Sequence, residues 1–312
     1  MTDTTFSSID DYLKKITEFD IHAMQLSSGK FFCRKTELQL PKLVISSRYV
    51  STSMQYHTTL KQDCFYIVIP RGNMNIAVNG YKTKLNQPLV FTFGQEIFAC
   101  IPENSRNFHI TIPTIELAKY FDEENIAQLK LATAQQNLGQ QVFFLSENSQ
   151  SHLCSLMEIL LNRNQLLSYQ AVLDAQETII ELLCKLLTLT SPLLKKNNTS
   201  QTTKLAIVKR ALGHLHKNTA INISVPELAD VSFCCLRSLE YAFKSVLSIT
   251  PKKYLIKRRL HLINTALKTE SNLSVSDIIK NFGVVNQGRF AQDYLKLYQE
   301  YPHQTRYRIL QL

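Results

Sequence analysis

The spacing of hydrophobic residues changes along the chain. Between about residues 38 and 113, apolar and β-branched residues alternate with polar ones, as in KLVISSRYV, DCFYIVIP and NFHITIP. Turn-forming pairs such as Asn79-Gly80 separate these stretches. A period of two, interrupted by such turns, predicts an antiparallel β-barrel or sandwich over this range.

A helical period follows the alternating region. The stretches SHLCSLMEILLNRN and AVLDAQETIIELLCKLLTLT predict two amphipathic helices within about 115–190. The polar stretch KKNNTSQTT then indicates a linker over 196–203. We therefore expect an α+β chain, with a first domain at 1–195 and a second, all-helical domain at 204–312.

The second domain repeats one apolar skeleton. Short helix, tight turn and longer helix occur twice, first around SVPELADVS and then around SVSDIIKNFG. This order is typical of a helix-turn-helix unit, whose second helix can enter a DNA major groove. The repeated positions lie fifty-one residues apart: Leu239, Phe243, Leu247 and Pro251, then Phe290, Tyr294, Tyr298 and Pro302. The predicted helices are 204–217, 225–231, 235–247, 251–269, 275–281, 287–299 and 302–309.

The net positive charge of the chain lies in the same part of the sequence. Residues 201–312 hold 17 Lys and Arg against 7 Asp and Glu, which accounts for the whole formal net charge of +10. A basic domain beside a neutral one indicates a polyanionic partner for that domain, and nucleic acid is the commonest polyanion in a cell.

These features together resemble the DNA-binding domain of the AraC/XylS family of bacterial transcription regulators. The resemblance covers residues 224–308, and the GRFAQDY and EYPHQT stretches are similar to a branch that includes ethanolamine-utilisation regulators. Phe233 and Ser248 depart from the family because they stand where glycine is usual, whereas Gly283 is kept. Ile279 also departs, because it stands where alanine is frequent. The matching residues are Leu228, Ala229, Arg237, Leu239, Phe243, Thr250, Pro251, Tyr254, Arg259, Leu260, Phe282, Gly283, Phe290, Tyr294 and Pro302.

The resemblance implies a role for each helix face. Arg, Gln and Glu side chains can read base edges, and Lys and Arg can contact phosphates. The implied base-contact residues are Arg237, Glu240, Tyr241, Gln287, Arg289 and Gln292. The implied phosphate-contact residues are Lys244, Lys252, Lys253, Arg258 and Lys296. Arg259, at the border of an apolar stripe, is expected to be structural and to pair with Asp277.

The same resemblance suggests partners. Two reading helices, at about 235–247 and 287–299, would touch successive major grooves of promoter DNA, roughly 34 Å apart. Contact with RNA polymerase, a small-molecule effector and a homodimer all stay open. The first domain, over about 40–200, resembles the cupin-related, AraC-binding-like sensory domain of such regulators.

The first domain offers little for catalysis. A cupin enzyme needs clustered metal ligands, and the strand region holds only His57, Glu96 and His109, without an HxH pair. We therefore expect no cofactor, no metal and no enzymatic activity. The strands would enclose a small-molecule pocket or serve self-association, and the helices at 151–164 and 170–189 would cover the barrel or form a dimer contact.

Two further readings stay open for the function. The same helices could bind DNA without sequence preference, or the strand domain could be a cupin-type enzyme with an attached regulatory domain. The acidic, polar N-terminus MTDTTFSSIDDYLKK is unlike a signal peptide, so a cytoplasmic protein that does not enter the membrane is expected.

Overall fold

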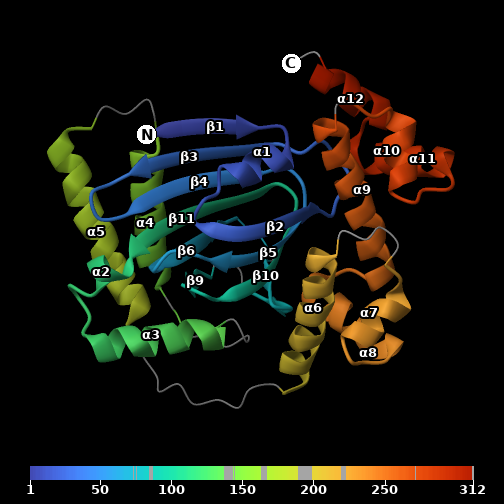
Figure 1. The fold of residues 1–312 in the computed structure, drawn as a ribbon. Coiled ribbons are helices and arrows are strands. Elements are labelled where there is room, and N and C mark those ends of the chain that lie inside the picture. The colour runs from blue at the N-terminus through green and yellow to red at the C-terminus, as the bar shows by residue number, and fades with distance from the viewer. Residues whose placement is uncertain are drawn as a thin grey trace.

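The alternating stretches form two antiparallel sheets in the computed structural model (Figure 1). The six-stranded sheet has the order β1 (Thr2–Phe6), β3 (Cys33–Gln39), β4 (Val44–Val50), β11 (Ser105–Pro113), β6 (Cys64–Arg71) and β9 (Leu89–Thr92). The five-stranded sheet has the order β2 (Phe19–Gln25), β5 (Met54–Leu60), β10 (Glu96–Ile101), β7 (Ala77–Val78) and β8 (Tyr81–Lys82). The structure describes residues 1–72, 74, 76–83, 87–136, 143, 145–162, 167–188, 199–218, 223–270 and 272–310.

The strands begin much earlier than the predicted start near residue 38. Strands β1, β2 and most of β3 precede that point, with the short helix α1 (Ile9–Lys14) between β1 and β2. Strands β1 and β3 lie at one margin of their sheet; β1 exposes most of its residues and β3 leaves most of its residues half-buried, many of them polar or charged. Their alternation is therefore weak in the sequence, although the predicted α+β fold class is confirmed.

One face of the six-stranded sheet is covered by helices. They are α2 (Thr114–Leu117), α3 (Glu123–Gln136), α4 (Glu147–Leu160) and α5 (Tyr169–Leu187). Ile67 and Ile69 of β6 share a core with Leu153, Met157 and Leu183 of α4 and α5. All five side chains are fully buried. The apolar stripes of α4 and α5 thus cover the sheet, which is the first of the two uses considered for them.

The C-terminal third is helical throughout its described residues. Helix α6 begins at Thr199, so residues 199–203 of the expected linker are helical, and residues 196–198 lie outside the described part of the chain. A polar helix start resembles a linker because its apolar face begins only at Leu205. The helices are α6 (Thr199–Lys217), α7 (Val225–Val231), α8 (Leu236–Leu247), α9 (Pro251–Thr269), α10 (Val275–Asn281), α11 (Gln287–Tyr298) and α12 (Pro302–Leu310).

These helices form two small cores that share α9. Leu239 and Phe243 of α8 pack in the first core, together with Tyr254 from the start of α9. Phe290 and Tyr294 of α11 pack in the second core, which includes residues from the later part of α9. One continuous helix therefore belongs to both units and ties them together.

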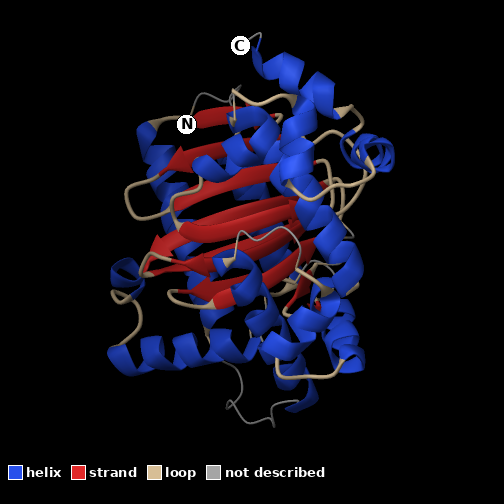
Figure 2. Ribbon diagram, turned by 45° about the vertical axis from the view of Figure 1, so that its right-hand side comes forward, coloured by secondary structure: helices blue, strands red, loops and turns tan. Residues whose placement is uncertain are grey.

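The C-terminal helices dock on the outer face of the five-stranded sheet. Met24 of β2 and Phe98 of β10 are buried in the first core among residues of α6 and α8. The two sheets consequently lie between helical layers (Figure 2). Among the described residues, no helix combines the length and the apolar character needed to cross a bilayer.

Candidate DNA-binding surface

The first helix-turn-helix unit is built from local capping. Ser224 and Glu227 form a capping box at the start of α7. Phe233 has a φ of 52°, and the next amide, of Cys234, donates to the Ala229 carbonyl at 3.0 Å. This is the Schellman ending in which glycine is favoured, so Phe233 adopts the family turn despite its side chain.

The second unit repeats that turn with glycine. Gly283 has a φ of 64°, and the amide of Val284 donates to the Ile279 carbonyl at 3.4 Å. Asn286 then caps α11 by accepting from the Arg289 amide at 2.9 Å. Both units therefore end the bracing helix in the same way, and the departure at Phe233 does not alter the local path of the chain.

Helices α8 and α11, the expected reading helices, differ in the exposure of their polar side chains. Arg237, Glu240 and Tyr241 are exposed on α8, and Arg289 and Gln292 are exposed on α11. Gln287 is half-buried, and its Nε2 donates to Ser276 Oγ of the bracing helix at 3.1 Å. Gln287 thus holds α11 against α10, and the sequence pattern had no means of showing this.

The expected phosphate-contact residues divide into two groups. Lys244, Lys252, Lys253 and Lys296 are exposed. Arg258 is instead half-buried, and its Nη2 donates to the Leu215 carbonyl at 2.7 Å and the Asn218 carbonyl at 3.0 Å. Arg258 therefore closes the carboxyl end of α6, which leaves it poorly placed for a phosphate.

An arginine of the last helix forms similar hydrogen bonds in the other unit. Arg306 of α12 is 7% exposed and donates to the carbonyls of Leu267, Glu270 and Leu273, at 2.6 to 3.1 Å. These carbonyls lie at and just beyond the carboxyl end of α9. No local pattern in the sequence points to Arg306, because its partners lie more than thirty residues away.

Arg259 has a different environment from the one expected. It is half-buried and lines a small space beside Phe282. Asp277 accepts a hydrogen bond from Ser274 Oγ at 2.6 Å, and the described residues contain no ion pair between it and Arg259. The structural role predicted for Arg259 therefore rests on packing, and the Asp277 pairing was wrong.

Cations from different elements converge near the second reading helix. Burial, followed by the charges of Lys253 and Lys296, lowers the pKa of Lys257 below its ordinary value. Lys253 and Lys257 belong to α9, whereas Lys296 belongs to α11. Positive charges that repel one another at such a surface are stabilised when an anion binds between them.

Both reading helices end against the N-terminal domain. The carbonyl of Leu247, at the end of α8, accepts from Cys100 Sγ at 3.4 Å. The carbonyl of Leu297, near the end of α11, accepts from Gln25 Nε2 at 3.2 Å and from the Gly29 amide at 3.0 Å. The N-terminal domain therefore contacts each reading helix at its carboxyl end.

The three residues considered as metal ligands do not come together. His57 Nε2 and Glu96 Oε1 lie 2.7 Å apart on the five-stranded sheet. His109 lies on the six-stranded sheet, where it contacts Arg48. Within the described ranges, no group of three or more His, Cys, Asp or Glu side chains is arranged to hold a metal ion.

The sequence of the C-terminal domain matches known proteins. Residues 228–308 match the family model described as "Helix-turn-helix domain". The "XylDLEGF operon transcriptional activator" of Pseudomonas putida is 32% identical over 99 residues, which cover 31% of each chain. The "Probable transcriptional regulator LumQ" of Photobacterium leiognathi is 34% identical over 95 residues, covering 30% of this chain and 36% of LumQ. The chain thus spans about a third of the length of the curated relatives it matches.

Comparison with solved structures gives matches of low similarity. The AraC-like transcriptional activator CuxR is 12% identical, with a TM-score of 0.46 over 84% of this chain and 94% of that chain. ToxT from Vibrio cholerae is 8% identical, with a TM-score of 0.30 over 95% of this chain and 99% of that chain. The sequence matches, rather than these shapes, make the C-terminal domain a helix-turn-helix domain of the AraC/XylS type.

Proposed function

We propose that the chain is a sequence-specific transcription regulator that binds double-stranded promoter DNA through α8 and α11. The observation that carries this proposal is the pair of helix-turn-helix units, each of which exposes an arginine in the first turn of its second helix. Arg237 and Arg289 hold these positions. Residues near the amino end of such a helix are the ones that usually meet base edges.

The lysines around the reading helices support binding to the backbone of the duplex. Lys244, Lys252, Lys253 and Lys296 are exposed. Of these, Lys252 and Lys253 lie on α9. Contacts of this kind contribute affinity that falls with salt and carry no sequence information. Lys257 joins the set because its charge lies close enough to Lys253 and Lys296 to be affected by both.

The names of the relatives fit the same proposal. Two of them are described as a transcriptional activator and a probable transcriptional regulator. A regulator of this type would act in the cytoplasm, where promoter DNA lies, and as an activator it would also contact RNA polymerase. The N-terminal domain would then modulate DNA binding through its contacts with the ends of α8 and α11.

One observation favours the rival reading of a sequence-indifferent binder. Gln287 bonds to Ser276 and so is not free to read a base, which leaves α11 with fewer base-reading groups. A selection experiment separates the two readings. Genomic fragments are captured by the purified full-length protein at near-physiological salt, with excess random DNA as competitor, and then sequenced.

A regulator is expected to enrich an element with two boxes about one helical turn apart. It should bind that element about 10³-fold or more tightly than random DNA. Recovery of fragments without a shared motif would overturn sequence-specific reading. Loss of all binding under competitor would overturn the proposal in the same way.

Single substitutions then assign the contacts. Arg289→Ala should weaken binding to the selected element by about 1–3 kcal/mol and relax the preference at one base pair. Lys252→Ala is the matched control, since loss of a phosphate contact weakens binding about equally on every sequence. Equal losses for Arg289→Ala on all sequences would remove Arg289 from the base-reading set.

A further inference from the structure

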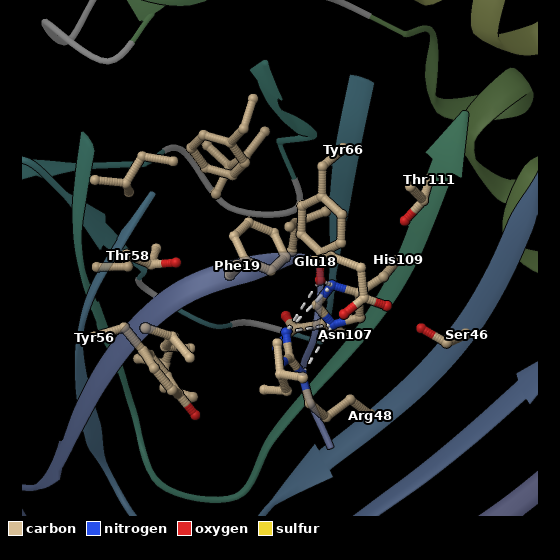
Figure 3. A pocket seen from close by; sticks show the side chains of 18 of the residues that line it. Glu18, Phe19, Ser46, Arg48, Tyr56, Thr58, Tyr66, Asn107, His109 and Thr111 are labelled. Carbon is tan, nitrogen blue, oxygen red and sulfur yellow. Dashed lines mark hydrogen bonds between the residues drawn. The ribbon is translucent and has the colours of Figure 1, made fainter. Parts of the chain in front are cut away.

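A cavity of about 120 Å³ lies between the two sheets (Figure 3). Different strands supply the apolar and the polar parts of its wall. The inward side chains of β6, β9, β7 and β10 supply an apolar wall, and those of β3, β4 and β11 supply most of the polar groups. The apolar wall consists of Val68, Ile76, Val78, Leu89, Phe91, Ile97 and Ala99, and Ile21 of β2 lies beside it.

Arg48 of β4 is the central cation of the polar wall. Its guanidinium donates to His109 Nε2, with Nη2 at 2.9 Å, and Nη1 donates to the Tyr12 hydroxyl. All of these partners are neutral. Among the described residues, no ion pair joins Arg48 to a carboxylate. A guanidinium buried without a counter-charge carries a large desolvation cost, so an anion bound beside Arg48 would be stabilised.

His109 is held in the neutral form. Burial, and then the charge of Arg48, keep the pKa of His109 well below its usual value. Because Nε2 accepts from Arg48, the ring proton sits on Nδ1, which lies 2.6 Å from the Tyr66 oxygen and donates to it. The Tyr66 hydroxyl hydrogen is then left to donate to a molecule in the cavity.

Two further polar groups face the cavity without a partner. Asn107 stands directly across from Arg48 in the β4–β11 register, is 4% exposed, and has an unpaired side-chain oxygen in the structure as described. Thr58 Oγ1, from the opposite sheet, is likewise buried and unpaired. Buried polar groups are nearly always satisfied, so both atoms are available to a molecule in the cavity: the Thr58 hydroxyl can donate to it, and the Asn107 oxygen can accept from it.

The charges and the volume limit what the ligand can be. The other cation of the polar wall, Lys35, already pairs with Glu37 at 2.6 Å, and Glu18 is partly exposed. Glu18 also lines the cavity, but among the described residues it forms no ion pair with Arg48, so Arg48 has no carboxylate partner and one carboxylate would supply it. An apolar cavity of about 150 Å³ accepts benzene, so this space suits a hydrocarbon body of about that size.

We infer that this cavity binds a small monocarboxylate, whose carboxylate pairs with Arg48 and whose hydrocarbon body packs against the apolar wall. The Tyr66 hydroxyl donates a further hydrogen bond to the carboxylate. The inference deepens the proposed function by naming the chemical class of the signal. Its test contains no DNA, so failure here and failure of DNA reading are separate results.

The experiment measures binding to the full-length protein by calorimetry. The probes are hexanoate and cyclohexanecarboxylate, and the neutral controls are hexanamide and cyclohexanecarboxamide. At least one acid should bind saturably, at least tenfold more tightly than its amide, since hydrogen bonds to a charged group are the strong ones. Equal affinity for acid and amide, or no saturable binding of either acid at millimolar concentration, would overturn the inference.

The variant Arg48→Met removes the charge and keeps most of the side-chain volume. It should abolish the preference for the acid over its amide, while binding of the amide shows that the cavity has kept its shape. Arg34→Met is the matched control, because Arg34 is exposed on β3 and pairs with Asp3 at 2.8 Å, away from the cavity. Unchanged acid binding by Arg48→Met would assign the site to other residues and refute the role of Arg48. If Arg48→Met does not fold, Arg48→Lys is measured instead, and it should bind the acid several-fold more weakly than the wild type.

Discussion

Several residues hold a left-handed backbone that their side chains disfavour. Ser248 and Gln299 end the two reading helices with φ values of 57° and 56°, and Phe233 ends α7 with 52°. A non-glycine residue in this conformation costs about 1–2 kcal/mol. The two units nevertheless follow the same path, because the Schellman hydrogen bonds and the apolar cores determine the geometry more strongly than one unfavourable φ.

Replacing Ser248 with glycine should therefore stabilise the protein. Glycine removes the steric penalty but adds about 0.5–1 kcal/mol of backbone entropy, so the free energy of unfolding should rise by about 0.5–1 kcal/mol. Urea unfolding followed by circular dichroism measures this change. Gly283→Ala is the opposite control and should lower the free energy of unfolding, and a loss of stability in Ser248→Gly would contradict the explanation.

The role of a residue could be predicted from the sequence only where that role depends on residues close by in the chain. The repeated stripe led to Leu239, Phe243, Phe290 and Tyr294, and all four are buried in the two cores. Arg258 looked like a phosphate contact because its partners at Leu215 and Asn218 lie about forty residues away. The cluster around Arg48 was not predicted either, since its members come from strands far apart in the chain.

At the level of elements, an arginine beside each unit binds the free carbonyls at a helix end. Arg258 of α9 binds those at the end of α6, and Arg306 of α12 binds those at the end of α9. Arg306 satisfies three carbonyls at and beyond the end of α9 while almost fully buried. Arg306→Met should lower the free energy of unfolding by about 2–3 kcal/mol, because charged hydrogen bonds are lost and buried carbonyls are left unpaired.

Arg308→Met supplies the control for that substitution. Arg308 belongs to the same helix, is exposed, and pairs with Glu300 at 3.1 Å. Loss of one surface ion pair should cost less than about 1 kcal/mol. Similar losses in the two variants, measured by urea unfolding, would mean that Arg306 does not act as a helix cap.

Helix α6 meets the five-stranded sheet through a stack of histidines. The His216 ring lies 3.9 Å from the His22 ring and 5.0 Å from the His57 ring, measured between centroids. Burial, followed by the charges of His22 and His57, lowers the pKa of His216 to about 3. The charged or titratable groups around this stack are Asp20, Glu96, Lys209 and Arg258.

The histidine stack should make stability depend on pH. An unfolded histidine takes up a proton below about pH 6.5, whereas folded His216 resists protonation down to about pH 3. The unfolded state then binds more protons between these values, so stability is complete above pH 6.5 and falls as the pH drops. Partial exposure of His216 reduces its share to about 1 kcal/mol per pH unit at most.

His216→Phe keeps an aromatic ring in the stack and removes the titrating group. Urea midpoints between pH 7.5 and 5.0 should fall less steeply in this variant than in the wild type. His152→Phe, at an exposed position of α4, should leave the wild-type slope unchanged. His22, His109 and His261 also have lowered pKa values, so some slope remains in His216→Phe. An unchanged slope would contradict linkage through His216.

Elements were predicted best where one face is strongly apolar. Helices α7, α9 and α10 have the predicted bounds, and α8 and α11 differ from theirs by one residue. The strands before residue 38 were missed, since β1 and β3 expose polar residues on much of their surface. The periodicity of hydrophobic residues reflects which side chains are buried. An element that buries few side chains therefore shows little periodicity in the sequence.

At the scale of the whole molecule, one strand connects the cavity between the sheets with helix α11. Strand β2 contributes Ile21 to the cavity wall, and at its end Gln25 donates to Leu297 of α11. A further contact between the two domains joins α1 to α9, where Asp10 and Lys268 form an ion pair at 2.9 Å. None of these contacts could be predicted from the sequence, because no pattern within one domain reports how two domains dock.

This docking and α9 together should hold the two reading helices at a fixed separation. Helix α9 has 19 residues and is therefore about 28 Å long, and it belongs to both cores. The carbonyls of Leu247 and Leu297 are also held by the N-terminal domain. A rigid pair of helices can meet two DNA boxes only at one spacing.

The spacing prediction is tested with variants of the selected DNA element. Insertion of five base pairs between the boxes turns the second box to the opposite side of the duplex. Insertion of ten restores its side but moves it by roughly 34 Å. Fluorescence anisotropy should show at least tenfold weaker binding for both insertions, close to that of an element with one scrambled box. Tight binding to the ten-base-pair insertion would mean that the units move apart on DNA, and equal affinity at every spacing would mean that one unit alone does the reading.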